Sequence, residues 1–349
     1  MTREPDRQAH VDGPSASKVV QTFLSASTGH AEADVSVCIV NWNGREVLRN
    51  CLLSLRAGNE PLRLQTIVVD NASADDSLSL VRDEFPEVLL IANSANRGFA
   101  AANNQAATAA AGRYLFFLNN DTVVQPASLV QLVEYLDSHP ESVAAGPKLN
   151  GADGKPQRSG RNLPTLRAML HWGALPVRWT KIFKRQYRAY RDAFDPEKAG
   201  PVPQLAAAAL MVRPAAFNEA GRWDEAFEFG MEDVDLCLRL AKFGTIYYLP
   251  DAHITHLGRV SSHLARGPVY RSYQCGTVRY FRKHHRSRLA PVIYKIAITI
   301  DTPIRLMILL VKTGLSRISG RREEAFRSSR RRAGVWFFVA HGFWRFWRS

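Results

Sequence analysis

The chain has 349 residues, 46% of them hydrophobic, so it can bury a sizeable core and is too long for a bare binding peptide. Its formal net charge of +14 comes from one segment, because between Arg279 and Ser349 there are 17 Lys and Arg residues against only Asp301, Glu323 and Glu324. A basic block confined to one segment and mixed with aromatic residues favours an anionic membrane surface over nucleic acid as its partner.

Two features limit where the chain can reside. Residues 1–34 lack both sustained periodicity and an uninterrupted apolar core, which predicts a mobile arm and not a signal peptide. No stretch reaches the roughly 18 uncharged apolar residues of a spanning helix. Between Leu289 and Leu315 the apolar pattern is broken by charges, which predicts a pair of helices on a surface.

The four cysteines have no Cys-x-x-Cys spacing and are predicted to be reduced and buried; they are Cys38, Cys51, Cys237 and Cys275.

From Val35 onwards, short apolar runs alternate with helical patterns, which predicts an α/β fold with a mostly parallel sheet covered by helices. Ser73 and Asp76 form a capping-box pattern for the second helix. The predicted strands are 35–40, 66–69, 88–92 and 114–118, and the predicted helices are 45–55, one that starts after Ser73, and 99–111.

The second half of the chain is less regular. Residues 150–204 contain Gly, Pro and many basic residues and are expected to form an excursion around an acceptor. Regular structure is predicted to resume with a strand over 205–212, helices over 214–220 and 232–243, a strand over 245–249 and a loop over 253–263.

Polar, turn-forming residues follow each of the first four apolar runs. In parallel sheets ligands bind beyond the carboxyl ends of the strands, so these residues are candidates for nucleotide contacts. For any single site, a simple strand-ending turn explains the same residues. The four segments are Asn41-Trp42-Asn43-Gly44, Asp70-Asn71, Asn93 to Gly98, and Asn119-Asn120-Asp121.

Acidic residues supply candidates for metal binding and for proton transfer. Asp121 stands at a strand end and could bind a hard cation such as Mg²⁺ or Mn²⁺, which takes oxygen ligands. Glu232 and Asp233 open a predicted helix and could activate an acceptor hydroxyl, although acids at this position also suit the helix dipole, which favours their ionised form. Asp235 should point elsewhere, towards a neighbouring Arg. His256 could complete the metal site, with His253 and His263 as competitors.

The sequence resembles the family 2 glycosyltransferases, especially their rhamnosyltransferase-like members with a GT-A fold. The resemblance covers about 35–262, and its motifs occur in the family's order. They are Val40-Asn41-Trp42-Asn43, Val68-Val69-Asp70-Asn71-Ala72-Ser73, Asn96-Arg97-Gly98-Phe99 with Asn103-Asn104, Leu118-Asn119-Asn120-Asp121-Thr122, Trp223-Asp224-Glu225, and Glu232-Asp233-Val234-Asp235-Leu236.

The resemblance implies an inverting, metal-dependent transfer from a nucleoside diphosphate sugar, dTDP-rhamnose first and UDP-hexose next. It implies that Asp70 reads the base, that Asp121 and His256 approach the metal, and that Asp233, beside Glu232, is the catalytic base. The remaining expected nucleotide-sugar contacts are Asn41, Asn43, Asn71, Asn96, Arg97, Gly98, Asn119 and Asn120. Where many relatives have Asp, this chain has Asn119, which leaves the motif a single carboxylate.

Three regions are therefore expected: an arm over 1–34, a GT-A domain over 35–278 with its nucleotide half at 35–125 and its acceptor half at 126–278, and a basic, aromatic helical tail over 279–349. The tail carries three of the seven tryptophans and is predicted to attach the enzyme to the inner face of the cell membrane, facing the cytoplasm, where a lipid-linked glycan would be the acceptor. Packing of the tail on its own domain is the competing interpretation. A non-catalytic partner of a glycan-assembly complex and a nucleotidyltransferase are the alternative functions.

Overall fold

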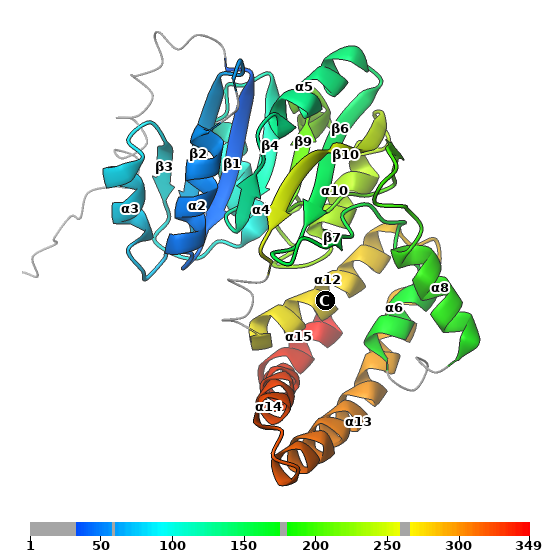
Figure 1. Ribbon diagram of the computed structural model, residues 1–349. Coiled ribbons are helices and arrows are strands. Elements are labelled where there is room, and N and C mark those ends of the chain that lie inside the picture. The colour runs from blue at the N-terminus through cyan, green and yellow to red at the C-terminus, as the bar shows by residue number, and fades with distance from the viewer. Residues whose placement is uncertain (1–32, 58–59, 175–179, 259–265) are drawn as a thin grey trace, which may run out of the picture.

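The computed structural model describes residues 33–57, 60–174, 180–258 and 266–349. The predicted arm therefore lies almost entirely outside the described residues, as does His263. The described part combines one mixed sheet with helices on both faces and a separate group of C-terminal helices (Figure 1).

The sheet has the order β3-β2-β1-β4-β9-β6-β10-β5, with β7 beside β6 and β8 beside β10. The predicted parallel arrangement holds for β3-β2-β1-β4 and for β6 beside β10, whereas the other pairings are antiparallel. The strands are β1 (Val35–Asn41), β2 (Leu64–Asp70), β3 (Leu89–Ala92), β4 (Tyr114–Asn119), β5 (Thr122–Val124), β6 (Ser142–Asn150), β7 (Pro156–Gln157), β8 (Gly200–Pro201), β9 (Ala209–Val212) and β10 (Thr245–His256).

Alternating side chains along the strands build two cores, because successive residues of a strand face opposite sides of the sheet. Tyr114, Phe116 and Leu118 of β4 pack under one group of helices, and Leu115 and Phe117 under the other. The first group is α2 (Arg45–Arg56), α3 (Ser77–Glu84) and α5 (Ser128–Ser138), and the second is α4 (Phe99–Thr108), α9 (Pro214–Glu219) and α10 (Glu232–Leu240).

A third core joins the remaining helices into a C-terminal group, with α6 and α8 beside it (Figure 1). Helix α12 runs continuously across position 278/279, where the sequence suggested a domain boundary. These elements are α6 (Leu166–Gly173), α8 (Lys181–Arg191), α12 (Arg266–His284), α13 (Ala290–Ile318), α14 (Arg322–Phe337), the π-helix η2 (Phe338–Gly342) and α15 (Phe343–Arg348).

Several predicted boundaries are wrong. Helix α3 starts at Ser77, so Ser73 does not cap it. The strand expected over 205–212 begins only at Ala209, and the strand expected to end at 249 continues to His256 through pairing with β5 and β6. In place of two helices over 289–315 there is one helix, α13, because most of the charges that interrupt the apolar pattern turn inwards.

Cys38, Cys51 and Cys237 are free and buried as predicted, and Cys275 is free and partly buried. Among the described helices, none has the combination of length and apolar content needed to cross a membrane.

Candidate active site

The loops after β1, β2 and β4 are tied together by a chain of buried side chains. Asp70 Oδ2 accepts a hydrogen bond of 3.0 Å from Asn41 Nδ2, and Asn41 Oδ1 accepts one of 2.7 Å from Asn120 Nδ2. Gly44 permits this approach, since a Cβ at that position would collide with Asn120. The carboxyl ends of three neighbouring strands thus form one polar floor.

The Ser73 side chain bonds to residues of this polar floor and does not cap helix α3. Its hydroxyl donates 2.7 Å to Asp70 Oδ2 and accepts 2.9 Å from the backbone N–H of Asn43, while its own N–H donates 2.8 Å to Asp70 Oδ1. Asn43 has a φ of 51° and accepts 2.7 Å from the Ala74 N–H. These bonds fix both loops at the edge of the predicted nucleotide pocket.

Asn71 organises the loop after β3. Its Nδ2 donates 3.1 Å to both Asn96 Oδ1 and the Gly98 carbonyl, and its Oδ1 accepts 3.1 Å from the Arg97 N–H. Gly98 has a φ of 85°, a conformation that favours glycine, and it precedes α4. The Arg97 side chain is exposed, so it is available to a ligand.

Asp121 and His256 are brought together by strand pairing. His256 lies opposite Thr122 in the antiparallel β5–β10 ladder, and the Leu257 N–H donates 2.9 Å to the Asp121 carbonyl. As a result His256 Nε2 is 3.3 Å from Asp121 Oδ1, and both side chains are largely buried. His253 lies three residues earlier on the same strand and therefore faces the other side of the sheet.

Gln157, at the end of β7, sets the tautomer of His256. Its Nε2 donates 2.7 Å to the His256 carbonyl, which fixes the orientation of the amide. Its Oε1, which can only accept, then faces His256 Nδ1 at 2.8 Å, so Nδ1 carries the proton. In the neutral ring, Nε2 therefore presents a lone pair, which lies 3.3 Å from Asn119 Nδ2 as well as 3.3 Å from Asp121 Oδ1.

This pair fits a divalent cation. At metal–ligand distances near 2.1 Å, two neighbouring ligands of an octahedral ion are about 3.0 Å apart, close to the separation of Asp121 Oδ1 and His256 Nε2. The described residues contain no group of three or more His, Cys, Asp or Glu side chains that could hold a metal. The remaining ligands would come from water and diphosphate, as is common for Mg²⁺ sites.

The acid pair at the start of α10 follows an unusual turn. Gly230 and Met231 both have positive φ, 84° and 73°, and for Met231 this conformation costs energy, as at other functional turns. Burial, helped by the charge of Asp233, raises the pKa of Glu232 to about 8. Burial also raises the pKa of Asp233, although the charge of Arg161 and backbone N–H groups of Val234 and Ala207 oppose the rise. The expectation that the helix dipole favours the ionised form does not hold for Glu232, because burial outweighs the dipole there.

The two acids differ in their surroundings. Glu232 is buried, and within the described residues its Oε2 has no hydrogen-bond partner. Asp233 is only partly buried and accepts 2.8 Å from the Val234 N–H. The pKa of both acids is thus raised, that of Glu232 to about 8, and Asp233 has the contacts that oppose the rise.

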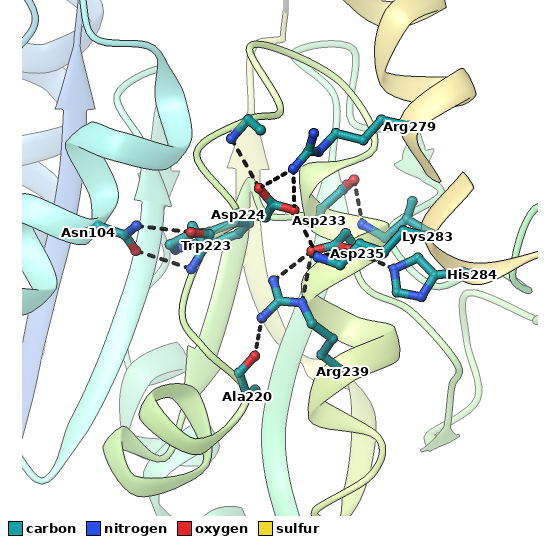
Figure 2. Close-up of polar contacts among 12 residues, drawn as sticks. Asn104, Ala220, Trp223, Asp224, Asp233, Asp235, Arg239, Arg279, Lys283 and His284 are labelled. Atoms are coloured by element: carbon teal, nitrogen blue, oxygen red, sulfur yellow. Dashed lines mark hydrogen bonds and ion pairs between the residues drawn. The ribbon is translucent and has the colours of Figure 1, made fainter. Parts of the chain in front are cut away.

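Asp235 points away from this pair, as predicted. Burial alone would raise its pKa, but hydrogen bonds from His284 and Lys283, with the charge of Arg239, lower it to about 2. Figure 2 shows Asp235 between Arg239 of α10 and the side chains of Lys283 and His284 from α12, while Asp224 binds Arg279. Helix α12 is thereby anchored behind the acid pair.

A short backbone segment connects the Asp121 motif with Asp233. The Asn119 N–H donates 3.0 Å to the Ala208 carbonyl, and the neighbouring Ala207 N–H faces the Asp233 carboxylate and opposes the rise of its pKa. These contacts also explain why β9 starts late, since residues 206–208 turn towards the site. They join the site's two ends across β4 and β9.

The sequence did not single out Gln157 or Arg161. Both lie in the segment expected to be irregular, and no motif marks them. The structure reveals Gln157 through its two bonds to His256, and Arg161 through its charge near Asp233.

The fold has a GT-A-type architecture, and the comparisons with known proteins identify a glycosyltransferase. More particularly, residues 36–200 match the family model "Glycosyl transferase family 2" and belong to that family, and the chain is rhamnosyltransferase-like. An N-acetylglucosaminyl-diphospho-decaprenol L-rhamnosyltransferase of Mycobacterium tuberculosis is 29% identical over 254 residues, which cover 66% of this chain and 80% of the relative. Rhamnosyltransferase WbbL of Escherichia coli is 25% identical over 260 residues, which cover 71% of this chain and 93% of the relative.

Two solved structures share the fold. The mannosyltransferase PcManGT from Pyrobaculum calidifontis, in complex with GDP-Man and Mn²⁺, has a TM-score of 0.52 at 16% identity, covering 90% of this chain and 88% of its own. GalNAc-T7 with UDP, GalNAc and Mn²⁺ has a TM-score of 0.54 at 19% identity, covering 71% of this chain and 48% of its own. At these identities the likeness concerns the fold alone.

Proposed function

We propose that this chain transfers a sugar, rhamnose from dTDP-rhamnose in first place and a hexose from a UDP-hexose next, to a hydroxyl of a lipid-linked glycan, with inversion at the anomeric carbon. The observation that carries the proposal is the Asp121–His256 pair, whose motif is bonded through the Asn119 N–H to Ala208, next to Ala207, which faces Asp233. The names of the mycobacterial and Escherichia coli relatives support a rhamnosyl donor, and the former supports a lipid-diphosphate acceptor.

Each end of the site has a separate task. Asp70, Asn41 and Asn120 form the floor for the nucleotide, and Asn71 holds the loop whose Arg97 side chain can reach the donor. Asp121 and His256 would hold Mg²⁺ or Mn²⁺, which supplies charge stabilisation for the departing diphosphate. Asp233 accepts the proton of the acceptor hydroxyl. In the same step the hydroxyl oxygen bonds to the anomeric carbon, and the bond from that carbon to the diphosphate breaks.

Glu232 keeps a proton at neutral pH and so does not compete with Asp233 as base. A neutral neighbour also avoids a second negative charge beside Asp233, which would raise its pKa further. The chemistry is a single displacement, because Asp233 acts on the acceptor oxygen and not on the sugar.

The acceptor would be reached at the inner face of the cell membrane, with the basic C-terminal segment as the attachment. The alternative is a non-catalytic partner of a membrane glycan-assembly complex. Retention of Asp121 and Asp233 together favours catalysis.

Thermal shift across a panel of sugar nucleotides, with and without Mn²⁺, tests the donor and the metal without an acceptor. We expect the largest stabilisation from dTDP-rhamnose with Mn²⁺, and we expect Asp121→Ala to remove the Mn²⁺-dependent part. Equal shifts with every nucleotide, unaffected by Mn²⁺, would contradict the donor and metal assignments.

A further inference from the structure

Helix α13 is amphipathic, but its exposed face is apolar, whereas a helix at a water-facing surface exposes its polar face. Fifteen of the twenty large apolar side chains exposed among the described residues lie at or beyond Leu289, and eleven of these belong to α13 or its N-cap. Their exposed fractions run from 44% for Val292 to 86% for Ile318. The eleven, called the α13 stripe below, are Leu289, Val292, Ile293, Ile296, Ile300, Met307, Ile308, Leu310, Val311, Leu315 and Ile318.

The inward face of the same helix packs Tyr294 and Ile298 into the third core and also carries several polar side chains. Lys295, Asp301, Thr302, Thr313 and Ser316 are all buried. Lys295 Nζ donates 2.8 Å to the carbonyls of both Trp347 and Ser349, and burial lowers its pKa.

A second set of bonds neutralises Asp301. Arg305 Nε donates 2.7 Å to Asp301 Oδ2, and Arg305 Nη2 donates 2.6 Å to the Gly173 carbonyl of α6. Charges that would be solvated on an ordinary surface helix are thus bonded inside the protein, whereas side chains that water disfavours point outwards.

We infer that the α13 stripe is a membrane-docking surface that lies flat at the headgroup boundary of a bilayer. The stripe is one-sided, and a helix of 29 residues is about 44 Å long, so it suits an interfacial orientation and not a crossing. An apolar patch of this extent on a soluble chain marks a contact surface.

Charge identifies lipid as the occupant. Both ends of the stripe carry exposed arginines, Arg286 and Arg288 before the helix and Arg317 and Arg322 at and beyond its end. Anionic headgroups complement both ends together. A second copy of the chain would bring positive ends beside positive ends in either orientation, which is unfavourable.

The stripe replaces the aromatic segment as the main attachment. Phe338 and Phe346 are buried in the third core and Val335 is buried as well, so much of that segment packs on its own protein, which was the competing interpretation from sequence. Trp336 and Trp344 remain exposed and can add to the contact.

This docking rests on the proposed function for its purpose, since a lipid-linked acceptor would be met at the bilayer. Helix α12 contacts α13 and also bonds Asp224 and Asp235 beside the acid pair, so docking would hold Asp233 at a defined height above the membrane.

Vesicle flotation tests the inference without an acceptor or turnover, so its failure is distinguishable from failure of the transfer reaction. The full chain would be mixed with vesicles of phosphatidylcholine and phosphatidylglycerol, alongside the double variant Ile300→Gln, Met307→Gln. Both positions are exposed, so folding should persist, which circular dichroism would verify. The matched control is Leu53→Gln, Phe243→Gln, which removes two exposed apolar side chains elsewhere.

We expect the α13 variant to partition at least about 30-fold more weakly than the unmodified chain and the control to be unchanged. Flotation of the α13 variant equal to that of the unmodified chain would overturn the inference. It would also be overturned if neither protein floats and sedimentation shows a dimer that only the α13 variant loses, because the occupant would then be a second copy.

Discussion

His256 Nε2 lies 3.3 Å from Asp121 Oδ1 because the β5–β10 ladder places His256 opposite Thr122. Asp121→Ala should reduce Mn²⁺ affinity and lower transfer by at least about 100-fold, since a metal contributes several kcal/mol to stabilising the departing charge. The fold should persist, because the carboxylate faces the unprotonated Nε2 of His256 and gains no hydrogen bond from it. Mn²⁺ titration by electron paramagnetic resonance and thermal melting would measure the two effects. Near-normal Mn²⁺ affinity in Asp121→Ala would contradict the metal assignment, and Asp251→Ala, at an exposed position, is the control.

Gln157 is a positioning residue, and its effect is visible in the His256 ring. In Gln157→Leu the Nδ1 proton loses its acceptor, so the ring should shift towards the tautomer protonated at Nε2. Long-range ¹H–¹⁵N correlation spectra would detect this change. Mn²⁺ affinity should fall by about 10-fold or more, as for other residues that orient metal-binding histidines. The control is Gln125→Leu, which replaces an exposed side chain bonded to Thr255 of β10. It should change neither the His256 tautomer nor the Mn²⁺ affinity. An unchanged His256 spectrum in Gln157→Leu would refute the role.

Glu232 and Asp233 should respond differently to removal of their charge. Glu232→Gln mimics the neutral acid present at pH 7, so kcat should stay within about tenfold of the unmodified enzyme, whereas Asp233→Asn should lose about 10²–10⁴-fold. Initial rates at pH 7 with saturating donor would measure both. The reverse order would make Glu232 the base.

The raised pKa of Glu232 also predicts a pH effect on stability. A folded-state pKa of about 8, above the ordinary 4.5, gives a contribution that is fully present below about 4.5 and is lost as pH rises through about 8. Glu232→Gln should therefore flatten the decline in melting temperature over that window. An unchanged decline would show that Glu232 titrates normally in the folded protein.

Asp235 should matter for stability, because it is fully buried among Arg239, Lys283 and His284. Asp235→Asn leaves buried cations without their partner and should cost about 3 kcal/mol of unfolding free energy. Urea denaturation would measure this loss. Because the folded pKa is lowered to about 2, the Asp235 contribution is present above about pH 4 and is lost as pH falls towards 2, so the two proteins should converge there. Asp251→Asn, at an exposed position, should have almost no effect at any pH.

Much of the first half of the fold was predictable. Its strands are short apolar runs followed by polar turns, and a parallel sheet places those turns along one edge. The bond from Asp235 to Arg239 was predictable from helical spacing. The capping role predicted for Ser73 was wrong, because its hydroxyl bonds to Asp70 at the end of β2.

The errors share a physical cause. Whether Glu232 is buried, and which face of α13 turns inwards, depends on packing between distant elements. Lys295, Asp301 and Arg305 appeared to break an apolar helix, yet the structure places their charges inside and the apolar side chains outside. Gln157 could not be identified because its partner, His256, lies on a strand remote in sequence.

The most direct test of the central claim is sugar transfer itself. Membrane vesicles containing polyprenyl-diphosphate N-acetylglucosamine would be incubated with radiolabelled dTDP-rhamnose and Mn²⁺, and the lipid fraction would be counted for the unmodified chain and for Asp233→Asn. We predict labelled lipid with the unmodified chain, with the anomeric configuration inverted relative to the donor, and almost none with Asp233→Asn. Equal labelling by both proteins, or a product that retains the donor's configuration, would contradict the account.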